Sequence, residues 1–187
     1  MAAGYDLVTL CHQDDLYLPG YGAAVQAMAS PDMLIYFSGY GEKRGEEVVT
    51  SSRLLRIKRL LLWRMRIRPF QRSRLMKHRT LALGDPICCP SVTFHLCRLP
   101  LPLFQTDMTT SLDWQAWERI SRMDGRFVYD PAVRMLHRIH TNSTTTQVLE
   151  KGGRQPEDYA MFRKFWCTPI ARLLTKWYSA SEKSNQL

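Results

Sequence analysis

The sequence has no apolar run long enough to cross a bilayer, and no segment typical of export. No apolar stretch approaches the ~20 residues that a transmembrane helix needs. Residues 1–6 have neither the basic region nor the apolar region of a secretory signal. We therefore expect a cytoplasmic protein that neither spans the membrane nor leaves the cell by an obvious route.

Cysteine pairs with the spacing of a metal site or a redox motif are also missing. The five cysteines of the 187-residue chain are scattered. Cys88 and Cys89 are adjacent, which is a poor geometry for a mutual bridge. Such an odd set excludes a disulfide framework and indicates free thiols in a reducing compartment.

Acidic residues are few, so the chain carries a strong positive charge. There are 26 Lys and Arg against 17 Asp and Glu, which gives a formal net charge of +9 and a pI near 9.6. Hydrophobic residues make up 45% and charged residues 23%, as in a globular domain and unlike a disordered chain. The expected partners are anionic: phosphate groups, acidic lipid surfaces or nucleic acid.

Near the start of the chain, a short apolar run ends abruptly in polar residues. Residues 7–11 have the length and composition of a buried strand, and His12, Gln13, Asp14 and Asp15 follow. Ligands of open α/β sheets sit at the carboxyl ends of strands. Adjacent carboxylates there repel each other unless a cation joins them, and a hard divalent cation with a substrate phosphate would do so. The alternative is that one Asp caps the next helix and the other is solvated.

Hydrophobic periodicity predicts an α/β domain in which strands and helices alternate. Strand-like runs occupy residues 7–11, 33–37, 87–96, 126–129 and 133–139, and helical patterns occupy 19–29, 112–123 and 156–179. The first two strands with the helix between them predict a β-α-β unit and a parallel sheet. Gly39-Tyr40-Gly41 predicts a turn after the second strand. In the last helical region, one stripe is expected to face the core: Tyr159, Phe162, Trp166, Ile170, Leu173 and Trp177.

Residues 52–79 form a basic helical segment. Leu54, Ile57, Leu61 and Met65 recur on one helical face, and Pro69 must break or kink the helix. One interpretation is a basic amphipathic helix that docks on an anionic membrane surface. The other is a helix packed on the sheet with solvated arginines.

The acidic segment resembles a motif of a known family. His12-Gln13-Asp14-Asp15-Leu16-Tyr17-x-Pro19 after an apolar strand resembles the metal-binding segment of family-2 glycosyltransferases. The resemblance implies that Asp14 binds Mg²⁺ or Mn²⁺ against the diphosphate of a nucleotide-sugar, with Asp15 beside it at the metal. His12 stands where the family usually has its first acidic residue, and we assign it to the donor diphosphate.

Asp113 is the candidate catalytic residue. A carboxylate at the mouth of an apolar pocket can act as a general base, but an Asp in the first turn of a helix can also merely complement the helix dipole. Asp113-Trp114-x-x-Trp117, followed by Gly125-x-Phe127-x-Tyr129, resembles the acceptor-side segment of the same family. That resemblance implies that Asp113 accepts the proton of the attacking sugar hydroxyl.

A third candidate group ends the strand at 133–139. Strand alternation places Arg138 and His140 on one face and His137 on the other. A guanidinium and an imidazole there would suit a phosphate and a metal, whereas the alternative is two surface residues at a strand end. The family has Tyr-Arg-x-His followed by a Ser/Thr-rich loop, which implies Arg138 on the diphosphate and His140 on the metal. His137 replaces the aromatic residue and is expected to pack instead.

These blocks, with a weaker one at Gly84-Asp85-Pro86-Ile87, follow the family's order over nearly the whole chain. They imply a partial GT-A-like fold over residues 1–187: a mixed sheet flanked by helices, with a basic helical insertion at 52–79 and C-terminal helices at 156–179. The nucleotide-binding half that precedes the acidic motif in the family is absent from these residues. The chain therefore resembles the carboxyl-terminal part of such an enzyme, which is truncated, started late, or split from a partner that supplies the missing half.

The implied function is metal-dependent, inverting transfer of a sugar from a nucleotide-sugar to a glycan or lipid-linked acceptor in cell-surface polysaccharide synthesis. It would take place in the cytoplasm, with peripheral contact at the inner face of an anionic membrane. The alternative function is a non-catalytic basic protein that binds a membrane surface or nucleic acid. No recognised nucleic-acid-binding motif occurs, so no nucleic acid partner is expected.

Overall fold

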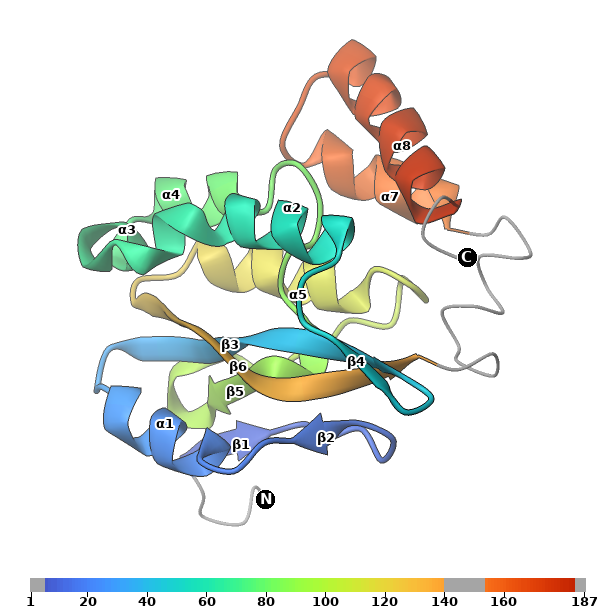
Figure 1. The fold of residues 1–187 in the computed structure, drawn as a ribbon. Helices are drawn as coiled ribbons and strands as arrows, with labels where there is room; N and C mark the ends of the chain where they lie inside the picture. The colour runs from blue at the N-terminus through green and yellow to red at the C-terminus, as the bar shows by residue number, and fades with distance from the viewer. Residues whose placement is uncertain (1–5, 140–153, 184–187) are drawn as a thin grey trace.

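The chain folds around a curled mixed sheet with helices on both sides (Figure 1). The structure is a computed structural model that describes residues 6–139 and 154–183. The six strands of the sheet are β1 (Leu7–Thr9), β2 (Leu16–Tyr17), β3 (Met33–Arg44), β4 (Glu47–Val49), β5 (Val92–His95) and β6 (Arg126–Ile139). Their order is β1-β5-β3-β6-β2, with β4 paired to β3.

The expected α/β class is confirmed, but the sheet is mixed and not parallel throughout. β3 and β6 form a parallel pair, and the other pairs are antiparallel. β1 and β3 are both antiparallel to β5, so they point the same way with β5 between them. The expected β-α-β unit therefore exists as a crossover through α1 (Tyr21–Met28), but its two strands are not neighbours.

Both ends of the strand order come close together because the sheet curls. β1 and β2 return beneath β3 and β6 (Figure 1). The Tyr17 hydroxyl on β2 donates to the carbonyl of Pro90, just before β5, at 2.5 Å. Tyr21 on α1 bonds Thr93 of β5 at 3.0 Å. The segment between β1 and β2, which carries His12, Asp14 and Asp15, is thereby held against the sheet.

The larger core lies on the opposite side of the sheet from α1 (Figure 1). Its helices are α2 (Arg53–Leu61), α3 (Arg68–Arg72), α4 (Arg74–Thr80), α5 (Leu112–Ser121), α7 (Gln155–Arg163) and α8 (Thr168–Lys183). Phe37 and Phe127 of the sheet face these helices. Trp114 and Trp117 of α5 are fully buried in the same core. Tyr36 and Val128 face the smaller core under α1, where the expected apolar face with Tyr21 and Val25 is confirmed.

The turn expected at residues 39–41 is wrong, because β3 runs straight through them. A Cβ on Gly39 would lie 2.8 Å from the Pro131 carbonyl oxygen, and one on Gly41 would lie 2.9 Å from Leu136 Cδ2. These glycines therefore permit the close approach of β6, which bulges at this point and continues as one strand where two were expected. The real turn comes at Gly45, whose φ of 59° favours glycine.

The apolar face expected for the basic segment is right for Met65 and wrong for Ile57. Leu55, Leu62 and Met65 are buried, whereas Ile57 is exposed. The Ser52 side chain caps α2 by accepting from the Leu55 N–H at 3.2 Å. After Leu61 the chain continues as a 3-10 helix, η1 (Leu62–Arg66), so the regular helical spacing does not extend to residue 65.

The apolar stripe that was expected to face the core in the C-terminal helices does so over only half of its residues. Phe162 is buried, and Tyr159 and Trp166 pack against the core, but Ile170, Leu173 and Trp177 of α8 are exposed. α8 instead packs through Ala171, Leu174 and Tyr178, which have the same helical spacing one position further on. Among the described residues, no helix is long and apolar enough to cross a membrane.

Candidate functional site

A tight turn directly after β1 presents the acidic segment. The Asp15 N–H donates to the His12 carbonyl at 3.3 Å, which folds residues 12–15 back on themselves. His12 Nδ1 consequently lies 3.6 Å from Asp15 Oδ2. His12 is exposed, Asp14 is half-buried and Asp15 is buried. The exposure of these three polar side chains therefore decreases from His12 through Asp14 to Asp15.

Strand β6 holds Asp15 in place. Leu16 pairs with Leu136, so Asp15 lies beside the next two residues of β6. Its Oδ1 accepts from the Arg138 backbone N–H at 3.0 Å and lies 2.8 Å from His137 Nδ1, which donates when that nitrogen carries the proton. The expectation that His137 packs as an aromatic substitute is therefore wrong. Strand alternation turns it away from the Arg138 side chain, and Asp15 lies on that side.

The second oxygen of Asp15 makes this turn a candidate metal site. Oδ2 is buried and has no hydrogen-bond partner among the described residues. A buried carboxylate oxygen without a partner is costly. One ligand atom each from His12, Asp14 and Asp15 lies within 4.8 Å of the others. Two carboxylates and an imidazole fit a divalent cation, and the carboxylate oxygens are ligands that suit both Mg²⁺ and Mn²⁺.

Asp113 stands in the first turn of α5, as expected. Its Oδ1 accepts from the Trp114 N–H at 2.8 Å. The indole N–H of buried Trp114 donates to the Leu81 carbonyl at 3.1 Å, which fixes the start of the helix. Glu157 of α7 holds the loop just before α5 by accepting from the backbone N–H groups of Thr109, Thr110 and Ser111.

A second carboxylate, Asp85, lies close to Asp113. Its Oδ1 accepts from the Ile87 N–H at 3.0 Å, and the residue is buried. Burial raises the pKa of Asp85 well above its usual value, the negative charge of Asp113 raises it further, and Lys58 opposes the shift. Asp85 therefore keeps its proton in a range where an exposed Asp is ionised. The sequence signal was present in the Gly84-Asp85-Pro86-Ile87 block, but it assigned Asp85 no role.

Lys58 adds a cation to the same neighbourhood. Its Nζ lies 5.4 Å from the centre of the Tyr40 ring. Burial opposes the charge of Lys58, but the neighbouring Tyr40 and Tyr178 raise its pKa above the ordinary value. Burial raises the pKa of Tyr40 to about 12. Both residues line a small pocket with Ser38, Gly39, Leu55, Arg59, Leu62, Pro86 and Tyr129. Nothing in the spacing of the sequence pointed to Lys58.

Two half-buried thiols, Cys88 and Cys89, interact electrostatically with both Asp15 and Asp113. Burial raises the pKa of Cys89, and the charges of Asp113, Asp85 and Asp15 raise it further. Burial likewise raises the pKa of Cys88, near Asp15 and Asp113. Both thiols therefore stay protonated at neutral pH. Neither cysteine is a nucleophile in this state.

The structure therefore brings His12, Asp14 and Asp15 together, and Asp113 shares with Asp15 an electrostatic effect on Cys88 and Cys89. Arg138 contributes its backbone N–H to Asp15, while its side chain is exposed. His140 lies outside the described residues, so its expected place near Asp14 stays a prediction.

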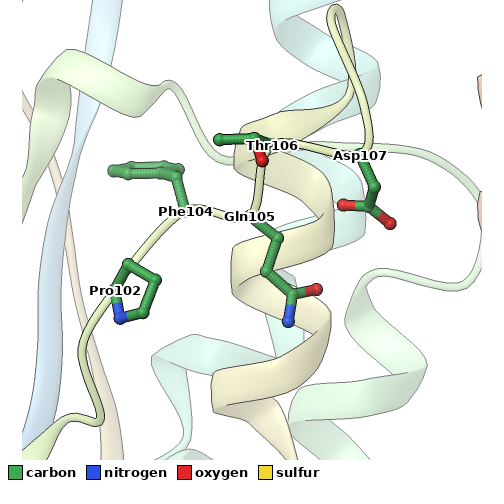
Figure 2. A pocket seen from close by; sticks show the side chains of 5 residues that line it. All are labelled: Pro102, Phe104, Gln105, Thr106 and Asp107. Carbon is green, nitrogen blue, oxygen red and sulfur yellow. The ribbon is translucent and has the colours of Figure 1, made fainter.

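A separate hollow lies in the loop before α5. Figure 2 shows its lining: Pro102, Phe104, Gln105, Thr106 and Asp107. Both carboxylate oxygens of Asp107 accept from Gln115 Nε2 at 3.1 Å, so this carboxylate is already hydrogen-bonded to another side chain of the protein. All the lining residues come from one loop, and we assign no chemistry to it.

Comparison with known proteins identifies no relative. No family model, no curated protein and no solved structure matches the chain. The function must therefore be inferred from the residues and their arrangement.

Proposed function

We propose that the chain forms the metal and acceptor side of a family-2 glycosyltransferase with a GT-A-like fold. It would transfer a sugar from a nucleotide-sugar to a glycan or lipid-linked acceptor of the cell surface, in the cytoplasm. The observation that carries this proposal is the buried Oδ2 of Asp15, which has no hydrogen-bond partner among the described residues and lies beside His12 and Asp14. Burial raises the pKa of Cys88 and of Cys89, and the charges of Asp113 and Asp15 both raise these pKa values further.

The acidic turn would hold the donor diphosphate through Mg²⁺ or Mn²⁺. Asp14 and Asp15 supply the carboxylate ligands, with His140 as the proposed third and His12 and Arg138 directed to the diphosphate. A bound cation supplies charge neutralisation for a leaving diphosphate, so no general acid is needed there. His137 and the Arg138 N–H both engage Oδ1 of Asp15, and this orients Oδ2 toward the turn.

On the acceptor side, Asp113 would take the proton from the attacking hydroxyl. The residue is half-buried at the start of a rigid helix, which suits a positioned base. Asp85 interacts with Asp113 and keeps its own proton, so it adds no second full negative charge next to the proposed base. With protonated Cys88 and Cys89 excluded as nucleophiles, a single displacement is the simplest step, and it inverts the anomeric carbon.

The nucleoside part of the donor would bind next to β1. This strand is terminal in the sheet order, and among the described strands it pairs only with β5. Such an edge has free backbone groups that can accept another strand. We propose that the nucleotide-binding half, supplied by a partner, docks along this edge beside the acidic turn.

Binding of a nucleoside diphosphate tests the donor site. We expect calorimetry to detect binding of UDP or GDP with Mn²⁺ and to lose it with a chelator. Asp14→Ala should abolish this metal dependence. Asp107 is an exposed acid in the loop before α5, and the control variant Asp107→Ala should keep the metal dependence. Equal binding by wild type and Asp14→Ala, with and without chelator, would contradict the proposal.

The catalytic role of Asp113 is tested in the complex with the nucleotide-binding half. Asn can still accept the Trp114 N–H, so Asp113→Asn should fold and bind donor normally. Sugar transfer should fall by roughly 10² to 10⁴, as expected for a lost general base. Transfer at the wild-type rate would place the base elsewhere, and a product with the donor's anomeric configuration would exclude the single displacement.

A further inference from the structure

The outer side of α2 and η1 exposes large apolar side chains in a line. Those side chains are Ile57 (44% exposed), Leu60 (67%), Trp63 (45%) and Ile67 (38%). Ile57 and Leu60 are three residues apart on α2 and share one side of that helix. Trp63 follows in η1, and Ile67 comes directly after η1. Leu55, Leu62 and Met65 cover the opposite side and are buried in the core. The segment thus has two apolar sides, and only one of them is used by the fold.

Cations surround this exposed stripe, and no acid lies near it in the sequence. Residues 48–84 contain no Asp or Glu, but they contain eleven basic side chains: Arg53, Arg56, Lys58, Arg59, Arg64, Arg66, Arg68, Arg72, Arg74, Lys77 and Arg79. Arg53 and Arg56 are exposed on α2. The Arg64 guanidinium lies over the Trp63 ring, 5.1 Å from its centre. The stripe therefore combines aliphatic chains, an indole and arginines on one face.

We propose that this α2 face, made of Ile57, Leu60, Trp63 and Ile67 with Arg53, Arg56 and Arg64, docks on an anionic lipid bilayer. The aliphatic chains would enter the boundary between headgroups and acyl chains. The indole of Trp63 suits the headgroup level. The arginines would pair with lipid phosphates, and each cation near such a surface adds to binding. Charge complementarity selects an anionic surface over a neutral one.

Other occupants fit this face less well. A nucleic acid would satisfy the arginines, but its backbone gives no environment for Ile57 and Leu60, since its contacts are mainly to phosphates. A second copy of the chain would place one set of arginines against the same set on its partner, because a two-fold interface is self-complementary. A lipid surface alone satisfies the apolar chains and the cations together.

Docking here would bring the candidate site toward the membrane. Lys58 lies between Ile57 and Leu60 in α2, but it turns inward to Tyr40 and the small pocket. The same helix thus exposes one side to the proposed bilayer and lines the neighbourhood of Asp85 with the other. If the proposed function holds, this arrangement favours a lipid-linked acceptor. The docking itself depends only on the α2 face and not on that function.

Vesicle flotation of the full chain tests the proposal. We expect the protein to float with vesicles of phosphatidylcholine and phosphatidylglycerol, to stay unbound with phosphatidylcholine alone, and to be released at high salt. Leu60→Gln should weaken partitioning by roughly 3- to 10-fold, because it withdraws one large apolar chain from the interface. Arg56→Gln should weaken it by about fivefold.

Leu101→Gln is the matched control, since Leu101 has the same 67% exposure as Leu60 but lies in the loop before α5. It should bind vesicles like wild type. Asp14→Ala should also bind like wild type, which separates this proposal from the donor site. Equal loss in Leu60→Gln and Leu101→Gln, indifference to phosphatidylglycerol, or binding of an RNA oligonucleotide without vesicle binding would each overturn the proposal.

Discussion

Asp15→Asn separates the structural role of one side chain from its proposed role as a metal ligand. The variant keeps the shape of the side chain. Its amide oxygen can still accept from the Arg138 N–H and from His137 Nδ1. Its NH₂ group replaces Oδ2, the buried oxygen beside His12 and Asp14. An amide nitrogen is not a metal ligand, so only the proposed ligand is removed.

The expected free energies follow from these contacts. A hydrogen bond to a charged group contributes about 1.5–3 kcal/mol and a neutral one about 0.5–1.5 kcal/mol, so two weakened bonds lose roughly 2–3 kcal/mol. Oδ2 is buried next to Asp14 and has no hydrogen-bond partner among the described residues. Removing its negative charge therefore stabilises the variant by a similar amount. The metal-free variant should therefore differ from wild type by about 1 kcal/mol or less. Wild type should gain about 2.7 kcal/mol at a Mn²⁺ concentration of 100 times its Kd.

Urea unfolding with and without Mn²⁺ measures both quantities. Wild type should be stabilised by the cation and Asp15→Asn should not. Asp107→Asn should respond like wild type, because Asp107 lies in a separate loop where it binds Gln115. The reasoning is refuted if Asp15→Asn gains the full Mn²⁺ stabilisation, or if the metal-free variant loses more than about 3 kcal/mol.

Three further predictions concern the fold around the site. Burial raises the pKa of Asp85. The contribution of its protonated form to stability is therefore complete below the ordinary Asp pKa and is lost as pH rises through the raised pKa. In urea unfolding at several pH values, Asp85→Asn should remove this loss of stability. Burial lowers the pKa of fully buried Lys77 from 10.5 to about 8, so stability should increase by about 3 kcal/mol as pH rises between these values, and Lys77→Met should flatten the increase. Gly39→Ala should cost about 2–4 kcal/mol because its Cβ would lie 2.8 Å from the Pro131 oxygen, whereas Gly22→Ala, with nothing within 4 Å, should not destabilise α1.

Local patterns predicted the parts of the site that depend on neighbouring residues. The apolar run before His12 does form a strand, although β1 ends at Thr9, and a polar turn follows it. Asp113 does open a helix with Trp114 and Trp117 buried behind it. Spacing of two to four residues decides these features, and the sequence displays that spacing directly.

Helix faces were harder to predict because two apolar stripes compete on the same helix. In α8 the stripe with Ile170, Leu173 and Trp177 is larger, yet the core takes Ala171, Leu174 and Tyr178. In α2 the core takes Leu55 and leaves Ile57 exposed. Periodicity shows that a side is apolar. It does not show whether that side meets the protein core or another apolar environment.

Local spacing does not predict contacts between distant residues. His137 reaches Asp15 across 122 positions, through the pairing of β2 with β6. Asp85 meets Asp113 only because the loop after α4 lies against the start of α5. Glu157 of α7 holds the loop before α5 by accepting from the Thr110 N–H. Each contact depends on tertiary packing, and no local spacing encodes it.

The central claim is that Asp14 and Asp15 hold a divalent cation against a diphosphate. Pulsed electron paramagnetic resonance of the protein with Mn²⁺ and a nucleoside diphosphate tests it most directly. The account predicts phosphorus hyperfine coupling to protein-bound Mn²⁺, lost in Asp14→Ala and Asp15→Asn. Protein-bound Mn²⁺ without phosphorus coupling, or coupling that persists unchanged in both variants, would contradict it.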